Sequence, residues 1–253
     1  MDLHDFSDVA MNYDNYLNEL GGNYTGFEDF YISLAEKYGG KGIIDIACGT
    51  GALVIPLAQR GFDISAFDLS AAMVEETNKK LKAEGLIATT FIANMIDFRT
   101  NRKYSLAIIA RSGFMHLLTP KEQRQALLNI KKHLTVGGIL TLNTFEPNPK
   151  LQAIQMDTTS EDYTFRAEFI NSEGRRERIY NAIGYNPQTQ IMSGNWKFET
   201  LDENDNVVDI RIRPLAMRQT YRTELEYLCE LCGYRIINIR PKYGGLIWIL
   251  EVL

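Results

Sequence analysis

Short apolar runs alternate with amphipathic stretches from residue 26 to residue 144. Runs typical of strands begin at residue 43 and recur at residues 63–67, 89–93, 104–110 and 139–144. Apolar residues at helical spacing predict helices at residues 26–38, 52–60, 71–84 and 121–134, and Gly137-Gly138 predicts the turn into the last of these strands. Strands that alternate with helices predict a doubly wound parallel sheet, which binds ligands at the carboxyl ends of its strands.

A different pattern follows Pro147 and Pro149. Strand-length runs fill residues 163–217, and turn-like segments interrupt them at residues 186–188 and 202–206. Met192, Trp196 and Phe198 alternate with polar neighbours, as in a sheet with one covered face. We therefore predict an inserted antiparallel sheet. The chain then returns to the main domain through a helix that ends near residue 232 and two strands, at residues 234–239 and 246–252.

These patterns divide the chain into three parts. Residues 1–38 are expected to form an N-terminal helical cap, in which Gly21-Gly22 separates a short helix from a longer one. Residues 39–149 and 218–253 are expected to form the α/β domain. Residues 150–217 are expected to form the inserted antiparallel β-sheet and to act as a lid that excludes water.

The first strand, which begins at Ile43, ends in a glycine turn. Gly49 and Gly51 lack a Cβ, so the main chain there can adopt positive φ and a ligand can approach it closely. The helix that follows presents free N–H groups at its start, which attract an anion or a carboxylate. Asp45 lies inside the strand, and Asp68 ends the next strand, where a carboxylate can accept hydrogen bonds from both hydroxyls of a ribose. We therefore expect a nucleotide-type site.

Two classes of enzyme use such a site. One class is the nicotinamide-dependent enzymes, although their fingerprint places a third glycine where this chain has Val54. The chain resembles the class I S-adenosylmethionine-dependent methyltransferases in its first two motifs, which comprise Asp45, Cys48, Gly49, Gly51 and Asp68. The resemblance covers most of residues 39–146 and residues 220–253, including the final antiparallel strands, which dinucleotide dehydrogenases usually lack. It implies a doubly wound, seven-stranded Rossmann-like sheet, and S-adenosyl-L-methionine as the methyl donor.

The resemblance also implies which residues hold the methyl donor. Gly49 and Gly51 would bind its methionine part, and Asp68 its ribose. Asn94 with Met95 would frame the adenine, and the side-chain oxygen of Asn94 can face the adenine amino group at a position where relatives often have Asp. The full expected cofactor-binding set is Asp45, Ala47, Cys48, Gly49, Gly51, Asp68, Leu69, Met73, Asn94, Met95 and Arg111.

Methyl transfer from a sulfonium is an in-line displacement, so the protein mainly has to hold the reactants together and exclude water. His116, in the loop after residues 104–110, is the candidate general base, because imidazole titrates near neutral pH. The alternative is a histidine that caps or packs beside the helix after Thr119, while an amine acceptor loses its proton to water. Tyr13 is the second candidate catalytic residue, as a hydroxyl that polarises or positions the acceptor, with packing as its alternative role.

The loop that ends in His116-Leu117 and the pair Tyr13 and Tyr16 are similar to segments of small-molecule N-methyltransferases, which act on amino sugars or simple amines and carry a β-rich insertion. We therefore expect a small polar acceptor, an amine or a hydroxyl, either free or sugar-linked. Relatives often have Asn-Ser where this chain has Arg111-Ser112, so the acceptor's identity does not carry over.

The expected substrate-binding residues are Tyr16, Phe114, Trp196 and Arg213. Arg213 shares a predicted strand face with Arg211, and a guanidinium directed into the pocket would suit a carboxylate or phosphate on the substrate. A solvated surface is the alternative position for such charges. Core packing is the alternative role for Trp196.

Composition and charge narrow the range of partners. The 253 residues include 27 Lys and Arg against 32 Asp and Glu, a net charge of −5, which lacks the basic excess of a nucleic-acid surface. No apolar run approaches the ~20 residues of a membrane span. Residues 1–10 carry acids where a signal peptide carries basic residues. We expect a cytoplasmic protein without nucleic-acid or membrane partners, and a homodimer formed through the inserted sheet.

Three cysteines, an odd number, do not make a disulfide framework. Cys229 and Cys232 lie in a predicted helix without a second ligand pair, so we expect core residues and no metal. Two other functions stay open from the sequence. One is a regulatory protein that binds the cofactor without catalysis, and the other is a methyltransferase that acts on protein or RNA through an open groove.

Overall fold

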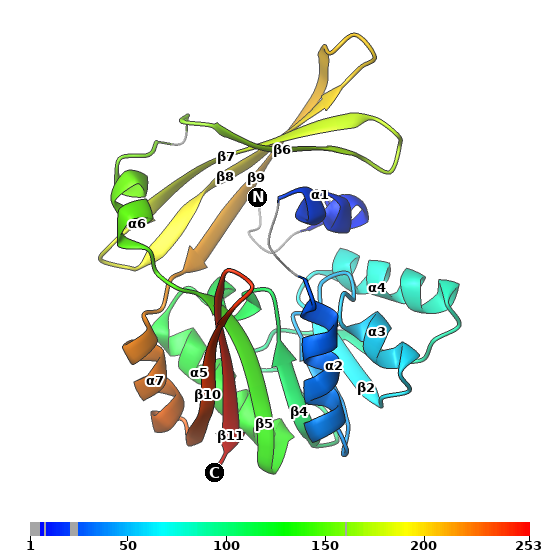
Figure 1. Cartoon of the computed structure of the whole chain (residues 1–253), viewed down its shortest axis with the longest axis vertical. Helices are drawn as coiled ribbons and strands as arrows, with labels where there is room; N and C mark the ends of the chain where they lie inside the picture. Colours follow the sequence, from blue (N-terminus) through cyan, green and yellow to red (C-terminus); the bar gives the residue numbers. More distant parts are fainter. Residues whose placement is uncertain (1–5, 8, 21–24, 160) are drawn as a thin grey trace. The chain divides into compact units, whose positions relative to one another are not determined.

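The computed structural model describes residues 6–7, 9–20, 25–159 and 161–253, which divide into two compact units (Figure 1). The smaller unit comprises Met1–Gly22 and Pro147–Gln219, and the larger unit comprises Asn23–Glu146 and Thr220–Leu253. The N-terminal residues thus belong to both units, rather than to the single cap expected at residues 1–38. The reason is packing, because α1 (Tyr13–Glu19) contacts the inserted sheet, whereas α2 (Phe27–Tyr38) contacts the parallel strands.

The larger unit is built on a seven-stranded sheet with the strand order β10-β11-β5-β4-β1-β2-β3. Its strands are β1 (Ile43–Ile46), β2 (Ile64–Asp68), β3 (Thr89–Ile92), β4 (Tyr104–Ile109), β5 (Leu134–Phe145), β10 (Tyr234–Lys242) and β11 (Gly245–Val252). The first five are parallel, and β11 is antiparallel to both of its neighbours. The doubly wound seven-stranded sheet and its antiparallel end are therefore confirmed.

Helices cover both faces of this sheet, in line with the alternation of buried side chains along each strand. Ile44 and Ile46 join a core with α5 (Pro120–His133) and α7 (Arg222–Leu231). Ile43 joins the opposite core with α2 and α3 (Val54–Gln59). A further helix, α4 (Ala71–Ala83), follows β2, and Ser70 lies at its N-cap position. The helices and strands expected between residues 26 and 110 are all present, with ends shifted by one or two residues.

The region around Gly137 differs from the prediction. The helix ends at His133, and β5 begins at Leu134 and runs through the glycine pair instead of starting after it. The pairing with β4 shifts there, since Tyr104 faces Leu134 but Leu106 faces Ile139. Gly137 has φ of +71°, so it is accommodated as an irregularity within one strand. A glycine inside a strand often marks such a bulge rather than its end.

The smaller unit contains a four-stranded antiparallel sheet with the order β6-β7-β8-β9. Its strands are β6 (Thr164–Ile170), β7 (Arg176–Asn186), β8 (Ile191–Leu201) and β9 (Val207–Arg218). The predicted turns at residues 186–188 and 202–206 connect β7 with β8 and β8 with β9. The inserted antiparallel sheet is therefore confirmed, although β7 and β9 are longer than typical strands.

A helix that the sequence analysis did not predict, α6 (Pro149–Met156), precedes this sheet and contacts β7. The side chain of Asn148 accepts hydrogen bonds from the backbone N–H groups of Lys150 and Leu151. Pro149 occupies the first helical position, where its missing N–H costs nothing. The prolines that indicated a break between domains therefore also begin a helix.

An aromatic core joins α1 and the preceding short helix (Ala10–Asn12) to one face of the inserted sheet. Tyr16 is buried against Phe198 of β8 and Phe169 of β6, with ring centroids 5.6 and 6.3 Å away. Tyr13 packs edge-on against Tyr16 at 5.1 Å. Burial of these rings explains why α1 belongs to the same unit as the inserted sheet.

The three cysteines are buried free thiols. Cys229 and Cys232 lie in the core between α7 and the sheet, so their expected packing role is confirmed. Across the described ranges, no cluster of three or more His, Cys, Asp or Glu could hold a metal. None of the helices in the described part of the chain has the length and apolar composition needed to cross a bilayer.

Candidate functional site

The segment after β1, residues 47–51, is here called the glycine loop. Its main chain enters the left-handed region at Ala47, Gly49 and Gly51, with φ of 56°, 56° and 85°. A Cβ built on Gly49 would meet no atom within 4 Å, so the backbone there is open to a ligand. At Gly51 a Cβ would lie 3.0 Å from Thr77 of α4, so the threonine would have to shift by a few tenths of an ångström. The two glycines therefore have different roles, one in exposing the main chain and one in packing against α4.

Asp68, the last residue of β2, is fixed beside the glycine loop. One carboxylate oxygen accepts a hydrogen bond from the N–H of Gly49 at 2.9 Å, and the other accepts one from the N–H of Ser70 at 2.9 Å. A carboxylate oxygen can accept more than one hydrogen bond. The carboxylate is therefore oriented before any ligand binds.

Helix α4 holds the other side of the glycine loop. The hydroxyl of Thr77, which is fully buried, donates to the carbonyl of Gly49 at 2.8 Å. The ammonium of Lys80 donates to the carbonyl of Thr50 at 2.9 Å. Because Thr77 and Lys80 are three residues apart on the helix, both reach the loop from the same face. These bonds fix two consecutive carbonyl groups and so define the shape of the loop.

Asp45 is 2% exposed and lies within β1 between neighbouring strands. Burial, which is the largest cause, and the negative charge of Asp68 together raise the pKa of Asp45 to about 8, although the positive charge of Arg111 opposes both. Burial also raises the pKa of the Cys48 thiol well above its ordinary value, with the charges of Asp45 and Asp68 adding to the effect. Cys48 is therefore a protonated thiol that packs in the loop and not a nucleophile.

The segment after β4, residues 111–116, is here called the β4 loop. Arg111 and Ser112 are consecutive non-glycine residues in the left-handed region, with φ of 46° and 64°. The N–H and the hydroxyl of Ser112 both donate to the side-chain oxygen of Asn143 on β5, at 2.7 and 3.1 Å. The guanidinium of Arg111 lies over the ring of Phe27, 5.2 Å from its centroid. The turn is thus tied to β5 on one side and to α2 on the other.

The two loops contact each other. A Cβ built on Gly113 would lie 3.1 Å from the Cβ of Ala47 and 3.2 Å from Ile109. Only a residue without a side chain fits this approach without displacing its neighbours. The glycine loop and the β4 loop are therefore packed together at the carboxyl ends of β1 and β4.

Two predicted residues of the β4 loop occupy different environments. His116 ends the short helix Gly113–His116 and is half-buried. Phe114 is fully buried in the core that contains α5, so the structure gives it a packing role, and its contact with a substrate stays a prediction. Thr119 accepts from the backbone N–H of Glu122 at 3.1 Å and begins α5 with a capping box, so the alternative role of His116 as the cap is not needed.

The remaining predicted cofactor residues follow β2 and β3. Leu69 is 41% exposed, whereas Met73 is 2% exposed on the first turn of α4. Asn94 follows β3, and its side-chain oxygen accepts from the N–H of Ile96 at 3.1 Å, which fixes the turn at this position. Met95 is partly buried against the core. The side-chain oxygen expected to face an adenine therefore already has one partner and keeps one lone pair.

The structure brings together most of the expected cofactor-binding set, since Asp45 lies in β1 and Asp68 ends β2, while the glycine loop, Leu69 and Asn94 follow the ends of β1, β2 and β3. The other candidates, Tyr13, Tyr16, Trp196 and Arg213, belong to the smaller unit. There they form or border the aromatic core, and the Arg213 guanidinium lies 3.4 Å from the ring centroid of Phe6. Arg213 is only 5% exposed, so it does not occupy a solvated surface.

Sequence reasoning missed Thr77, Lys80, Ser112 and Asn143. A threonine and a lysine on a helix carry no sign of a loop contact 30 residues away along the chain. Asn143 did carry a signal, because it is a polar residue near the carboxyl end of an otherwise apolar strand. Polar side chains at that position of a parallel sheet commonly serve the ligand site.

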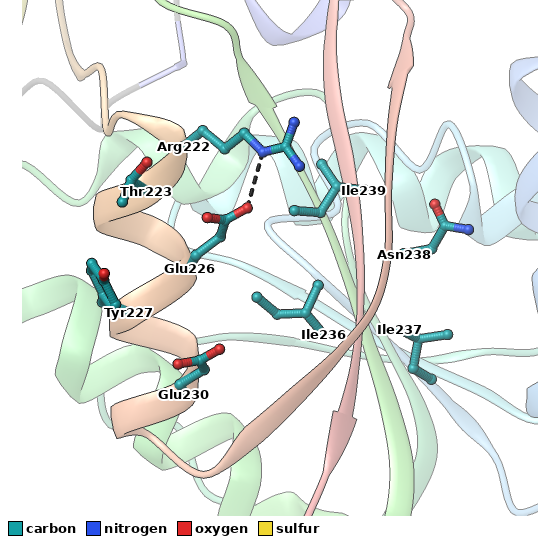
Figure 2. A pocket seen from close by; sticks show the side chains of 9 residues that line it. All are labelled: Arg222, Thr223, Glu226, Tyr227, Glu230, Ile236, Ile237, Asn238 and Ile239. Carbon is teal, nitrogen blue, oxygen red and sulfur yellow. Dashed lines mark hydrogen bonds and ion pairs between the residues drawn. The ribbon is translucent and has the colours of Figure 1, made fainter.

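Two grooves lie elsewhere on the larger unit. One, of about 430 Å³, is lined by residues of α7 and β10, and Figure 2 shows Ile236 and Ile239 pointing from β10 toward Glu226 and Glu230 of α7. The other, of about 490 Å³, lies at residues 39–42 and 61–63, at the amino ends of β1 and β2. Neither groove contains a predicted site residue.

Comparison with known proteins finds similarity in the larger unit. Residues 43–138 match a family model described as "Methyltransferase domain". A glycine/sarcosine N-methyltransferase of Halorhodospira halochloris is 32% identical over 120 residues, which are 46% of this chain and 44% of that protein. A dTDP-3-amino-3,4,6-trideoxy-alpha-D-glucopyranose N,N-dimethyltransferase of Streptomyces venezuelae is 30% identical over 100 residues, 40% of each chain. The chain spans about half the length of the curated relatives it matches.

A solved structure extends the likeness to both units. The S-adenosylmethionine-dependent methyltransferase from Clostridium acetobutylicum ATCC 824 superposes with a TM-score of 0.78 and 16% identity, covering 98% of each chain. Because the two sequences are only 16% identical, this match shows a shared fold and nothing about activity. It includes the inserted sheet as well as the seven-stranded sheet, because nearly the whole chain is covered.

Proposed function

We propose that this chain, whose residues 43–138 are a methyltransferase domain, is an S-adenosylmethionine-dependent enzyme that methylates an amine nitrogen of a small polar acceptor, either free or sugar-linked. The observation that carries the proposal is the glycine loop, whose backbone is open at Gly49 beside a carboxylate that is already oriented. The nicotinamide alternative has no comparable support, since the sheet ends in an antiparallel pair and the relatives are methyltransferases.

The residues present fit S-adenosyl-L-methionine. Asp68 is a rigid acceptor for the two ribose hydroxyls, and the open main chain at Gly49 accommodates the methionine part. Asn94 and Met95, after β3, are assigned to the adenine, and Leu69 and Met73 to the edge of the same site. When bound, the cofactor supplies a methyl group on a positively charged sulfur, and the protein has to hold the acceptor in line and exclude water.

His116 is proposed as the general base. It is half-buried in the β4 loop, which packs against the glycine loop, and imidazole accepts a proton near neutral pH. An amine nucleophile must lose a proton during methylation, and a positioned base removes it without waiting for solvent. Tyr13 stays a sequence-based candidate for positioning the acceptor.

Nitrogen is favoured over oxygen as the methylated atom because of the named relatives. Both curated relatives described above are N-methyltransferases, one acting on glycine and sarcosine and the other on a nucleotide-linked amino sugar. These two acceptors share a primary or secondary amine next to polar groups. We therefore assign the same chemical class to this chain.

The experiment that tests the proposal is a transfer assay with methyl-labelled S-adenosyl-L-methionine and paired amine and alcohol acceptors of matched size, with His116→Ala beside the unchanged protein. We expect label on amines, and a loss in kcat of about 100-fold to 10,000-fold in His116→Ala, the range for removing a general base. His133→Asn is the matched control, because His133 ends α5 and bonds the carbonyl of Asn129. Label only on alcohols would refute the choice of nitrogen, and an unchanged kcat would refute the role of His116.

We further infer a homodimer formed through the face of the inserted sheet that carries Val208, Ile210 and Ile212. Its edge strand β9 exposes Val208, Ile210 and Ile212 at 53%, 55% and 47%. Across the same face, Ile210 aligns with Glu199 and Arg178, so apolar and oppositely charged side chains alternate and suit a two-fold copy of themselves.

The double variant Ile210→Lys/Ile212→Lys should be monomeric by light scattering, whereas Ile87→Lys, which changes a 90% exposed residue of the other unit, should not alter the mass. A monomeric unmodified protein would refute the dimer.

We infer a cytoplasmic location from the thiols. Cys48, Cys229 and Cys232 are free, and a reducing compartment keeps thiols in this form. Fractionation of cells that express the untagged protein tests this, and recovery in a secreted fraction would overturn it.

A further inference from the structure

The turn at the end of β4 is held in a backbone conformation that its residues do not prefer. Arg111 and Ser112 both have φ in the left-handed region, at 46° and 64°. Residues with a Cβ rarely adopt this region, and two in succession are less common still. Such strain persists only where the surrounding structure imposes it, and it concentrates at functional sites.

Asn143 holds the turn at Arg111-Ser112 in this conformation through hydrogen bonds. Its side-chain oxygen accepts from both the N–H and the hydroxyl of Ser112, at 2.7 and 3.1 Å. Asn143 is 7% exposed and Ser112 is 1% exposed, so these bonds lie out of water, where an unpaired polar group is costly. The contact therefore gives the N–H and the hydroxyl of Ser112 a buried acceptor at the strained turn.

Through its contact with Ser112, Asn143 on β5 can influence the positions of both the β4 loop and the glycine loop. The turn leads directly into Gly113, which abuts Ala47 of the glycine loop at the distance given above, and then into His116. Ala47 is itself in the left-handed region, at φ of 56°. A relaxed turn at residues 111–112 would move Gly113 away from Ala47 and would move His116 with it.

Resting on the function proposed above, we propose that Asn143 is a positioning residue, whose side-chain oxygen locks the left-handed turn at Arg111-Ser112 and thereby fixes His116 relative to the glycine loop. Asn143 touches neither reactant in this role. It acts through Ser112 and Gly113, so its loss should lower the rate of transfer more than the affinity for the methyl donor.

If backbone strain at Ser112 is the cause, a second substitution should restore part of the kcat lost in Asn143→Ala. A general loss of stability predicts no such recovery. Asn143→Ala removes the acceptor and should reduce kcat by about 10-fold to 100-fold, the cost of a small misplacement of a reacting group. Ser112→Gly removes the conformational penalty, because glycine enters the left-handed region freely. The double variant Asn143→Ala/Ser112→Gly should therefore recover part of the kcat that Asn143→Ala loses.

A matched control lies two residues away on the same strand. Thr141 is fully buried, and its hydroxyl has no hydrogen-bond partner among the residues that the structure describes. Thr141→Val removes that hydroxyl from the same strand face without changing any contact of the turn. We expect its kcat and thermal midpoint to match those of the unmodified protein. Asn143→Asp keeps an acceptor at the same position and should retain more kcat than Asn143→Ala.

Hydrogen exchange followed by mass spectrometry gives a readout that does not require turnover. The peptide that contains residues 111–116 should exchange faster in Asn143→Ala, and protection should return in the double variant, with exchange in β1 and β2 unchanged. Equal kcat and equal exchange in Asn143→Ala, or no recovery of either in the double variant, would overturn the proposal. If the unmodified protein bound no methyl donor, the proposed function would fail, while the exchange result would still decide the role of Asn143.

Discussion

At the scale of single residues, Asp45 has the most unusual chemistry in the site. It lies inside β1 with almost no exposed surface, and burial raises the pKa of its carboxyl from 3.8 to about 8. The charge of Arg111 opposes the increase without cancelling it. The carboxyl is therefore protonated at neutral pH in the ligand-free protein, which removes the cost of a buried charge.

Stability should depend on pH through this group. The folded protein holds the Asp45 proton more tightly than the unfolded chain, so protonation stabilises the fold at low pH. This stabilisation is lost as pH rises from the unfolded pKa of 3.8 toward the folded pKa of about 8. Asp45→Asn stays neutral at every pH and should lack the loss. Thermal midpoints of both proteins from about pH 5 to about pH 8 check the prediction, and parallel curves would contradict it.

At the residue scale, the sequence predicted the residues of a local motif but not the residues that act through contacts between distant segments. Asp45, Gly49, Gly51 and Asp68 were identified because the motif is local in the sequence. Asn143 and Thr77 were not, because each acts on a loop through a contact that only the folded chain creates. Side-chain hydrogen bonds to distant backbone groups leave no periodic pattern in the sequence.

At the scale of elements, α4 forms one wall of the site. Thr77 and Lys80 bind consecutive carbonyl groups of the glycine loop, and a Cβ on Gly51 would crowd Thr77. The helix therefore determines the shape of a loop that precedes it by some 20 residues. A second crossover helix is usually regarded as packing for the sheet, and here it also shapes the ligand site.

Thr77→Val tests the contribution of α4. Valine keeps the methyl group that contacts Gly51 and loses the hydroxyl that donates to the Gly49 carbonyl. We expect a loss of about 1 kcal/mol in the free energy of unfolding and weaker binding of S-adenosylhomocysteine, because the loop loses one of its anchors. Titration calorimetry and denaturant unfolding measure the two effects.

Lys79→Ala is the control on the same helix. Lys79 is exposed and pairs only with Glu75 and Glu76 at the surface, among the contacts of the described residues. It should change neither quantity measurably. Equal ligand affinity in Thr77→Val and the unmodified protein would show that α4 does not shape the site.

Elements were predicted well where periodicity was strong and less well where proline or glycine interrupted it. The alternation of strands and helices up to residue 110 identified each element of the parallel sheet. Gly137 was expected to end a loop, yet it lies inside β5, because a bulge costs less than breaking the pairing with β4 and β11. Asn148-Pro149 indicated a boundary, and the same residues cap α6.

At the scale of the whole molecule, the chain consists of a larger unit, whose residues 43–138 match a methyltransferase-domain model, and a smaller unit that combines the inserted sheet with its own N-terminal helix. The sequence predicted the inserted sheet from its two turns and from the alternation around residue 196. It did not predict that α1 and α2 belong to different units, because their amphipathic patterns do not specify which sheet each helix covers. That choice depends on the partners of Tyr16 and Phe27, which lie far away in the sequence.

The central claim is that the ends of β1 and β2 form a site for S-adenosylmethionine. It is tested most directly by calorimetric titration with S-adenosylmethionine, S-adenosylhomocysteine and NAD, on the unmodified protein, Asp68→Ala and Asp63→Ala. Asp63 precedes β2 at its other end and pairs with Arg102, so it controls for the loss of a carboxylate. We expect binding of both sulfur ligands, a loss of at least about 10-fold in Asp68→Ala and none in Asp63→Ala. Binding of NAD alone, or equal affinity in Asp68→Ala, would contradict the account.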